Sequence, residues 1–341
     1  MALPKKQQRT ANNKHPGTQS TAKDEEGQQY RRRFKNHFDR EYEPTAHLVS
    51  SAFKGQASTD QTLTIALPGS ILENVQSEKL RTVLVGNIAR FCAIFCVHEI
   101  VIYKESEVKD EHVDYNVHMA KILQYLETPQ YLRKALFQHD HVLKYCGALN
   151  PLDAPHHVRI TEKSEYREGV TMFSDDVSTT VNVGLEKPIK VRGSIPDRSR
   201  VTVRMDYTSR KLPGTVVDPE EPMMKGYYWG YQVRMAGDLL EVFDNSVLGI
   251  PAYDTVIGLS ERGSNDTGPI GEAKKKSNHV LLVLGGLAGL EHAFSFCKNK
   301  RGIEKVEDLF NFWWNFLPTQ GSRTIRTEEA LPLALAYFDT L

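Results

Sequence analysis

Residues 63–103 constrain the fold most strongly, because they show the pattern of a strand, a helix and a second strand in close succession. Leu63–Leu67 is a short apolar run that ends in a Pro-Gly-Ser turn, and Glu99–Tyr103 is a second apolar, β-branched run. Between them, after the potential N-cap Ser77, apolar residues recur with helical spacing at Leu80, Leu84, Ile88, Phe91 and Phe95. Two strands joined in this way run parallel, so the pattern predicts an α/β fold with a parallel sheet.

The same alternation resumes near the C-terminus. Tyr253–Leu259 and Val280–Leu284 have the composition of buried strands, and Glu328–Phe338 is expected to be a terminal helix. Further helices are expected over 114–127 and 129–137. Residues 60–154 and 236–341 are therefore predicted to be two parts of one α/β domain.

Residues 155–235 differ from their surroundings, because their apolar residues alternate with a period of two in short runs separated by Gly, Pro and Asp. This pattern predicts a small OB-like β-barrel domain inserted into the α/β domain. Within it, residues 187–211 contain eight basic residues against Asp197 and Asp206. This segment is either a solvated outer face or, as we prefer, an RNA-binding groove formed by Lys187, Lys190, Arg192, Arg198, Arg200, Arg204, Arg210 and Lys211.

Residues 1–44 are nearly free of aliphatic side chains and hold ten basic against six acidic residues, a composition that favours a disordered basic tail. A basic helix that forms on RNA, or a nuclear address, is the alternative. The whole chain has 43 basic and 43 acidic residues and no net charge, so any attraction to nucleic acid must be local.

Several protein classes are not supported by the sequence. The apolar stretches 88–102 and 280–290 are too short and too polar to span a membrane. The pairs His139/His141 and His156/His157 lack further ligands at fixed spacing, so no metal site is expected. The four cysteines, Cys92, Cys96, Cys146 and Cys297, show no zinc or redox spacing, which indicates a reducing compartment. Cys92 and Cys96 are expected in the core, because they lie four residues apart on the apolar helix face.

Three loops near strand ends are candidates for ligand binding: 258–263, the glycine-rich 285–289, and 318–329. Ligands of open α/β sheets bind outside the carboxyl ends of the strands, where glycine allows close approach to the backbone. A nucleotide-like ligand is expected, although neither a GxGxxG nor a GxxxxGK[ST] motif is present.

Three segments resemble the motifs of the SPOUT RNA methyltransferases. Gly86–Ile102 is similar to the first motif, the glycine-rich loop ending in Glu291 to the second, and Gln320–Ala330 to the third. The third motif is closest to the version found in enzymes that methylate ring nitrogen 3 of uridine in ribosomal RNA. With the insertion between the first and second motifs, residues 63–341 resemble the eukaryotic and archaeal SPOUT subgroup.

The resemblance implies a C-terminal trefoil knot, a homodimer and bound S-adenosylmethionine. The residues that match the family's motifs imply the lining of the S-adenosylmethionine site. They are Leu259, Gly263, Leu284, Gly285, Gly286, Leu287, Gly289, Gln320, Ser322, Thr324 and Ile325.

The resemblance also implies catalytic residues. Arg90 would bind phosphate or stabilise charge on the target base, or else form a structural salt bridge to Glu291 or Glu329. Glu291 is the expected carboxylate near the methyl group, and Arg326 or Arg323 would position RNA.

The resemblance implies that the chain methylates a uridine of large-subunit ribosomal RNA in the nucleus or nucleolus, with the cytoplasm as a second location. A noncatalytic RNA-binding or scaffold protein at the mitotic spindle or centromere is the alternative. The aromatic cluster Phe310–Phe316 is expected in the core or a dimer interface rather than against a flipped base.

Overall fold

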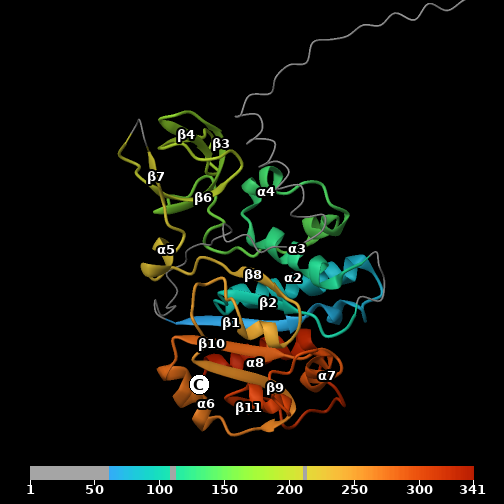
Figure 1. Ribbon diagram of the computed structural model, residues 1–341. Coiled ribbons are helices and arrows are strands. Elements are labelled where there is room, and N and C mark those ends of the chain that lie inside the picture. Colours follow the sequence, from blue (N-terminus) through green and yellow to red (C-terminus); the bar gives the residue numbers. More distant parts are fainter. Residues whose placement is uncertain (1–60, 108–112, 210–212) are drawn as a thin grey trace, which may run out of the picture. The chain divides into compact units, whose positions relative to one another are not determined.

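The computed structural model describes residues 61–107, 113–209 and 213–341 (Figure 1), all of which belong to one compact unit. The predicted basic tail, 1–44, lies outside these residues. Within the described ranges, no helix has the length and apolar character needed to cross a bilayer. The unit contains one sheet of six strands and one of five.

The six-stranded sheet is parallel throughout, which confirms the predicted α/β class. Its order is β11-β9-β10-β1-β2-β8, and in Figure 1 the strands descend from β8 to β11. Ile65 of the central strand is in register with Leu282 on one side and Ile100 on the other. All carboxyl ends therefore lie along one edge of the sheet. The strands are β1 (Thr62–Pro68), β2 (Glu99–Tyr103), β8 (Gln232–Ala236), β9 (Thr255–Ser264), β10 (His279–Leu284) and β11 (Phe312–Trp314).

The helix between β1 and β2 forms as predicted. The Ser77 hydroxyl accepts the Leu80 N–H at 3.3 Å, and α2 (Glu78–Ile94) then buries Ile88 and Cys92 against the sheet. The remaining longer helices are α3 (Tyr115–Glu127), α4 (Gln130–Leu136), α6 (Gly268–Lys276), α7 (Gly289–Phe296) and α8 (Thr327–Asp339). Since α2 contacts both α3 and α8, it links the two parts of the α/β domain.

The second sheet is an antiparallel, nearly closed barrel. Its order is β5-β4-β3-β6-β7, and Gly214 of β7 lies so near Ile189 of β5 that a Cβ there would be 2.9 Å from the Ile189 Cδ1. Val181, Val191 and Val203 form its buried core. The strands are β3 (Tyr166–Ser174), β4 (Ser178–Asn182), β5 (Ile189–Arg192), β6 (Arg200–Met205) and β7 (Gly214–Val217), followed by the short α5 (Glu221–Met224).

The chain leaves the barrel earlier than the sequence pattern suggests. β8 hydrogen-bonds to β2 within the parallel sheet, with Val233 in register with Ile100. The predicted end of the insertion at residue 235 therefore falls inside a strand of the other sheet. Its mixed run of apolar and polar residues fits both kinds of sheet, which explains why periodicity alone did not separate them.

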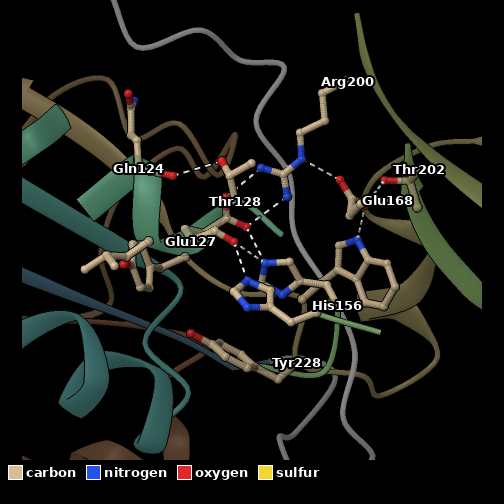
Figure 2. Close-up of polar contacts among 12 residues, drawn as sticks. Gln124, Glu127, Thr128, His156, Glu168, Arg200, Thr202 and Tyr228 are labelled. Carbon is tan, nitrogen blue, oxygen red and sulfur yellow. Dashed lines mark hydrogen bonds and ion pairs between the residues drawn. The ribbon is translucent and has the colours of Figure 1, made fainter. Parts of the chain in front are cut away.

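A buried ion network connects the barrel to α3 (Figure 2). Arg200 of β6 donates from Nη1 and Nη2 to the Glu127 carboxylate at 2.6 and 2.9 Å, and from Nε to Glu168 of β3 at 2.6 Å. Thr202 and the Trp229 indole donate to the other oxygen of Glu168 at 2.7 and 2.8 Å. Burial opposes ionisation of Glu127, yet Arg200 and His156 hold the pKa of its carboxyl well below the ordinary value.

Arg200 is therefore a structural residue, and the expectation that it binds RNA is wrong. Its side chain is only 2 % exposed, and its guanidinium faces two carboxylates inside the protein. We predicted an RNA-binding role for Arg200 from the charge of its segment. The composition of a segment does not tell on which face of a strand each residue lies.

Replacing Arg200 tests whether the buried ion network contributes more to stability than an exposed ion pair does. Arg200→Met leaves two buried carboxylates without their cation, and we expect a loss of about 3–5 kcal/mol in the free energy of unfolding. The matched control Arg204→Met, which breaks a partly exposed pair with Glu221, should cost under about 1 kcal/mol. Urea denaturation followed by circular dichroism measures both, and equal losses would contradict the assigned role of the network.

Candidate active site

Three strand-end segments meet at the carboxyl edge of the parallel sheet. Glu105 follows β2, and its carboxylate accepts the hydroxyl of Ser70, which follows β1, at 2.6 Å. The backbone N–H of Gly286, which follows β10, points to the other oxygen of Glu105 at 3.4 Å. Residues separated by as many as 216 positions thus form one cluster, at the edge where open α/β sheets bind ligands.

Gly286 has no room for a side chain in this cluster. A Cβ at this position would lie 2.1 Å from Oε1 of Glu105, and one at Gly285 would lie 2.7 Å from the backbone of Gly289 and Leu290. Gly289 itself has a φ of +78°, which favours glycine. Glycine is therefore required in the 285–289 loop by close packing against Glu105 and the start of α7, while Leu287 and Ala288 are exposed.

Glu105 is the buried titratable group of this edge, with 6 % of its surface exposed. Burial raises the pKa of its carboxyl, and the hydrogen bonds from Ser70 and Gly286 oppose the shift. Its position after β2 makes it a part of the candidate site that the sequence analysis missed. The signal was present, since an acidic residue, Glu105, lies two positions after the predicted strand Glu99–Tyr103.

The C-terminal helix begins beside the same loop. The Thr327 hydroxyl, in the first turn of α8, donates to the Gly285 carbonyl at 2.7 Å, and the Tyr103 hydroxyl donates to the Leu284 carbonyl at 2.7 Å. These bonds fix the backbone on either side of the end of β10. Residues of the second and third predicted motifs are thus in contact.

The predicted lining residues of the third motif differ in exposure. Gln320 and Ile325 are half-buried, whereas Ser322 and Thr324 are exposed. Arg323 is exposed too, and Arg326 is exposed at the position just before α8. The Glu329 carboxylate accepts the backbone N–H of Arg326 at 2.9 Å, which stabilises the first turn of the helix.

The segment 258–263 is part of a strand, not the loop expected from the sequence. β9 continues to Ser264, and Leu259 is buried in register with Leu284 of β10. A Cβ at Gly263 would lie 2.6 Å from the backbone of Trp314, so this glycine allows β11 to approach β9. Trp314 is almost completely buried, which confirms that at least this aromatic residue belongs to the core.

The exposed side of the site carries an ion pair. Glu291, in the first turn of α7, accepts from Arg262 of β9 at 2.9 Å, and both side chains remain accessible. Leu287, at the tip of the glycine loop, is one of the most exposed large apolar residues described. A carboxylate, a guanidinium and an apolar side chain are thus accessible in the loop or next to it.

Arg90 is not part of this cluster within one chain. It lies near the end of α2, which runs back from the carboxyl edge of β1 toward the amino end of β2. Its Nη1 donates to the carbonyl groups of Pro151 and Leu152, with 3.4 Å for the Pro151 contact. The alternative of a salt bridge to Glu291 or Glu329 is not observed, since Glu291 pairs with Arg262.

The other basic residues predicted to bind RNA differ in their surroundings. Lys187, Lys190, Arg192 and Arg198 are exposed on the barrel, whereas Arg204 pairs with Glu221. Arg210 and Lys211 lie outside the described residues.

The two His pairs lie in different environments, because His139 and His141 are exposed whereas His156 is fully buried. His156 and His157 both contact the Glu127 carbonyl through Nε2, and Asp140 accepts from Lys121 at 2.7 Å. Among residues 61–107, 113–209 and 213–341, no group of His, Cys, Asp and Glu is arranged to hold a metal ion.

The fold and this edge define a parallel α/β protein with a glycine-rich loop at the carboxyl ends of its strands, and comparison with known proteins gives the family. A family described as "Putative RNA methyltransferase" matches residues 62–338. The 28S rRNA (uridine-N(3))-methyltransferases of Mus musculus and Homo sapiens are 44 % and 42 % identical to the chain, over 81 % and 84 % of it and 75 % and 80 % of their own lengths. The enzyme of the same description from Drosophila melanogaster is 43 % identical, over 81 % of the chain and 61 % of its own length, which is less than two thirds. The chain therefore belongs to this family of RNA methyltransferases.

The contact between Gly286 and Glu105 can be measured by a double-mutant cycle. Gly286→Ala places a methyl group against a buried carboxylate, and we expect it to reduce the free energy of unfolding by about 1–3 kcal/mol. In a Glu105→Ala background most of this cost should disappear, giving a coupling energy of about 0.5–3 kcal/mol. Gly321→Ala is the control, because a Cβ there meets nothing within 4 Å. Purely additive losses in urea denaturation would refute the contact.

Proposed function

We propose that the chain transfers the methyl group of S-adenosylmethionine to ring nitrogen 3 of a uridine in large-subunit ribosomal RNA. The observation that carries this proposal is the glycine backbone of residues 285–289, held against Glu105 and Thr327 at the carboxyl edge of the sheet. Membership of an RNA methyltransferase family supports the reaction class. The three relatives named above support the substrate, because their names specify 28S rRNA and uridine N3.

The residues at the carboxyl edge fit a bent nucleoside cofactor. Within the protein the Gly286 N–H, the Gly286 carbonyl and the Gly285 carbonyl are already bonded, to Glu105, Gly289 and Thr327, so in our proposal the other backbone groups of the loop hold the adenine, next to the buried strand-end pair Leu259 and Leu284. When bound, S-adenosylmethionine supplies an electrophilic methyl group on a sulfonium. In our proposal Leu287, Gly289, Gln320, Ser322, Thr324 and Ile325 complete the lining, and Gly263 contributes through the packing of β9 against β11.

Uridine N3 carries a proton that must leave when the methyl group arrives, so the site needs alignment and a proton acceptor. We assign the acceptor role to Glu291, which is accessible at the start of α7 and is oriented by Arg262. Glu105 is too deeply buried to meet the base directly, and we assign it the positioning of the Gly286 backbone. Arg326, exposed beside Thr327, would hold the RNA backbone near the loop.

A homodimer would bring Arg90 to an active site. Val83, Asn87 and Ile94 lie exposed on one face of α2, at helical spacing with Arg90. α8, which contacts α2, carries the exposed apolar Leu333 and Tyr337. Exposed apolar residues on two adjacent helices support a shared interface, across which Arg90 would reach the partner's glycine loop.

The trefoil knot is a further element of the proposal. The hydrogen bond from Thr327 to the Gly285 carbonyl supports it, because it brings the chain back to the end of β10 after more than forty residues. A nuclear or nucleolar location follows from the proposed substrate. The noncatalytic alternative at the spindle or centromere predicts the same fold without methyl transfer.

Titration calorimetry with S-adenosylmethionine, followed by reaction with transcribed large-subunit RNA, tests the proposal. We expect binding to the folded protein and formation of 3-methyluridine, detected by mass spectrometry of the digested nucleosides. A folded protein that binds no S-adenosylmethionine would overturn the proposed methyltransferase activity and favour a noncatalytic scaffold protein. Binding with methylation at another atom would retain the enzyme class and correct the substrate.

Mixed dimers can test whether Arg90 acts across the interface. Arg90→Ala should abolish methyl transfer while S-adenosylmethionine affinity stays within a few-fold. Gly285→Val should lose cofactor binding, because its side chain would meet the backbone of Gly289. If the two inactive variants are refolded together, about half of the dimers contain one chain of each kind, and each of these mixed dimers has one intact site out of two. About a quarter of wild-type activity should therefore return. If no activity returns from correctly folded mixtures, Arg90 does not act across the interface.

A further inference from the structure

The hairpin between β3 and β4 of the barrel presents an unusual apolar surface. Met172, Phe173 and Val177 are 55 %, 64 % and 76 % exposed, although most large apolar side chains described are buried. All three are on the inserted domain, whereas the candidate active site is built from the ends of the parallel sheet. The proposed reaction does not use them, so their exposure requires another explanation.

A β-bulge turns Phe173 outward. The register between β3 and β4 shifts between Thr171 and Phe173, and Phe173 then pairs with Thr180. Thr171 is held on the other side by the loop before β6, where its carbonyl accepts the Arg198 N–H at 2.9 Å and its hydroxyl accepts the Ser199 N–H at 2.8 Å. The aromatic ring is therefore presented by a fixed strand rather than by a loose loop.

Cations share the outer face with this ring. Phe173 is in register with Thr180, and Thr180 is in register with Lys190 of β5, so the three form one row across three strands. In the neighbouring row Ser178 pairs with Arg192. Lys190 and Arg192 are both exposed, whereas Ile189 and Val191 of the same strand are buried. The backbones of Lys190 and Phe173 are two strand spacings apart, about 10 Å. The long side chain of Lys190 can bring its ammonium group closer to the ring.

Two exposed acidic residues, Asp175 and Asp176, lie at the hairpin turn, and Asp175 is near enough to Lys190 to interact with its charge. The Asp175 carboxylate accepts the backbone N–H groups of Val177 and Ser178 at 2.9 and 2.7 Å, so it is used to form the turn. An exposed aromatic ring beside two cations matches the two parts of an unpaired nucleotide, a flat base and a phosphate. A purely apolar protein partner would not require the two basic residues and the threonine and serine hydroxyls between them.

We propose that the outer face of β3, β4 and β5 binds single-stranded RNA, with an unpaired base stacked on Phe173 and the backbone on Lys190 and Arg192. The inference rests on the proposed function, since it takes RNA as the substrate. It assigns to the barrel a sequence-tolerant grip on unpaired nucleotides next to the modified one. This surface replaces the wider basic groove expected from the sequence, from which the structure removes Arg200.

Fluorescence anisotropy with a short fluorescein-labelled oligouridylate tests the stacking surface. Because a base stacked on an aromatic residue contributes about 1–3 kcal/mol, Phe173→Ala should raise the Kd by about 5- to 150-fold. Phe173→Tyr should restore binding to within a few-fold. Met224→Ala removes another large exposed apolar residue, 73 % exposed on α5, and should leave the Kd unchanged.

The remaining variants separate stacking from charge. Lys190→Ala with Arg192→Ala should weaken binding and reduce the slope of log Kd against log salt by about 1–2, whereas Phe173→Ala should leave that slope unchanged. If wild-type protein binds the oligouridylate and Phe173→Ala binds equally well, the stacking surface is refuted. If Phe173→Ala retains RNA affinity but loses a protein partner in a pull-down, the hairpin is a protein-docking site instead.

The test is also independent of the methyl-transfer proposal. Titration with S-adenosylmethionine should give the same affinity for Phe173→Ala as for wild type, because the hairpin is not part of the glycine loop. Wild-type protein that binds the cofactor but no oligouridylate would overturn this inference alone. Wild-type protein that binds oligouridylate through Phe173 but no cofactor would overturn the proposed enzyme and leave the RNA surface standing.

Discussion

The pairing of β1 with both β2 and β10 is the constraint on which the rest of the structure depends. β2 follows β1 after a single helix, but β10 comes more than 200 residues later. Because all three strands are parallel, this pairing aligns Ser70, Glu105 and Gly286 at one edge. The candidate active site is thus a consequence of sheet order, and an insertion of any length between β2 and β10 leaves it intact, provided that its two ends return to the sheet.

The inserted barrel meets this condition through buried charge rather than apolar contact alone. Arg200 links Glu127, where α3 ends, to Glu168 on β3, and Trp229, just before β8, donates to the same Glu168. The end of α3, the barrel and the segment that leaves the barrel are therefore joined in one hydrogen-bonded network. Such a network adds little net stability over an apolar core, but a misplaced barrel would separate Glu127 from Arg200, which favours a single arrangement.

The sequence predicted the elements with strong periodicity and failed where side chains have two possible faces. β1, α2 and β2 form almost as predicted, because their apolar spacing is a direct record of burial. The 258–263 segment has glycine and polar residues typical of a loop, yet Gly263 is needed so that β11 can approach. Glu105 could have been found from its place after a strand, whereas its contact with Gly286 depends on the long-range pairing of β1 with β10, which no local pattern contains.

The barrel shows why net charge was a poor guide to the RNA surface. Arg200 and Arg192 are both basic strand residues, but Arg200 faces the buried network and Arg192 faces solvent. The informative residue is instead Phe173, whose exposure contradicts its hydrophobicity and therefore marks a surface with a function. A basic residue on a surface needs no explanation, whereas an aromatic ring held in solvent by a clamped bulge costs solvation free energy in the free protein. That cost is offset when a base covers the ring, so the geometry favours a surface selected for binding rather than for folding.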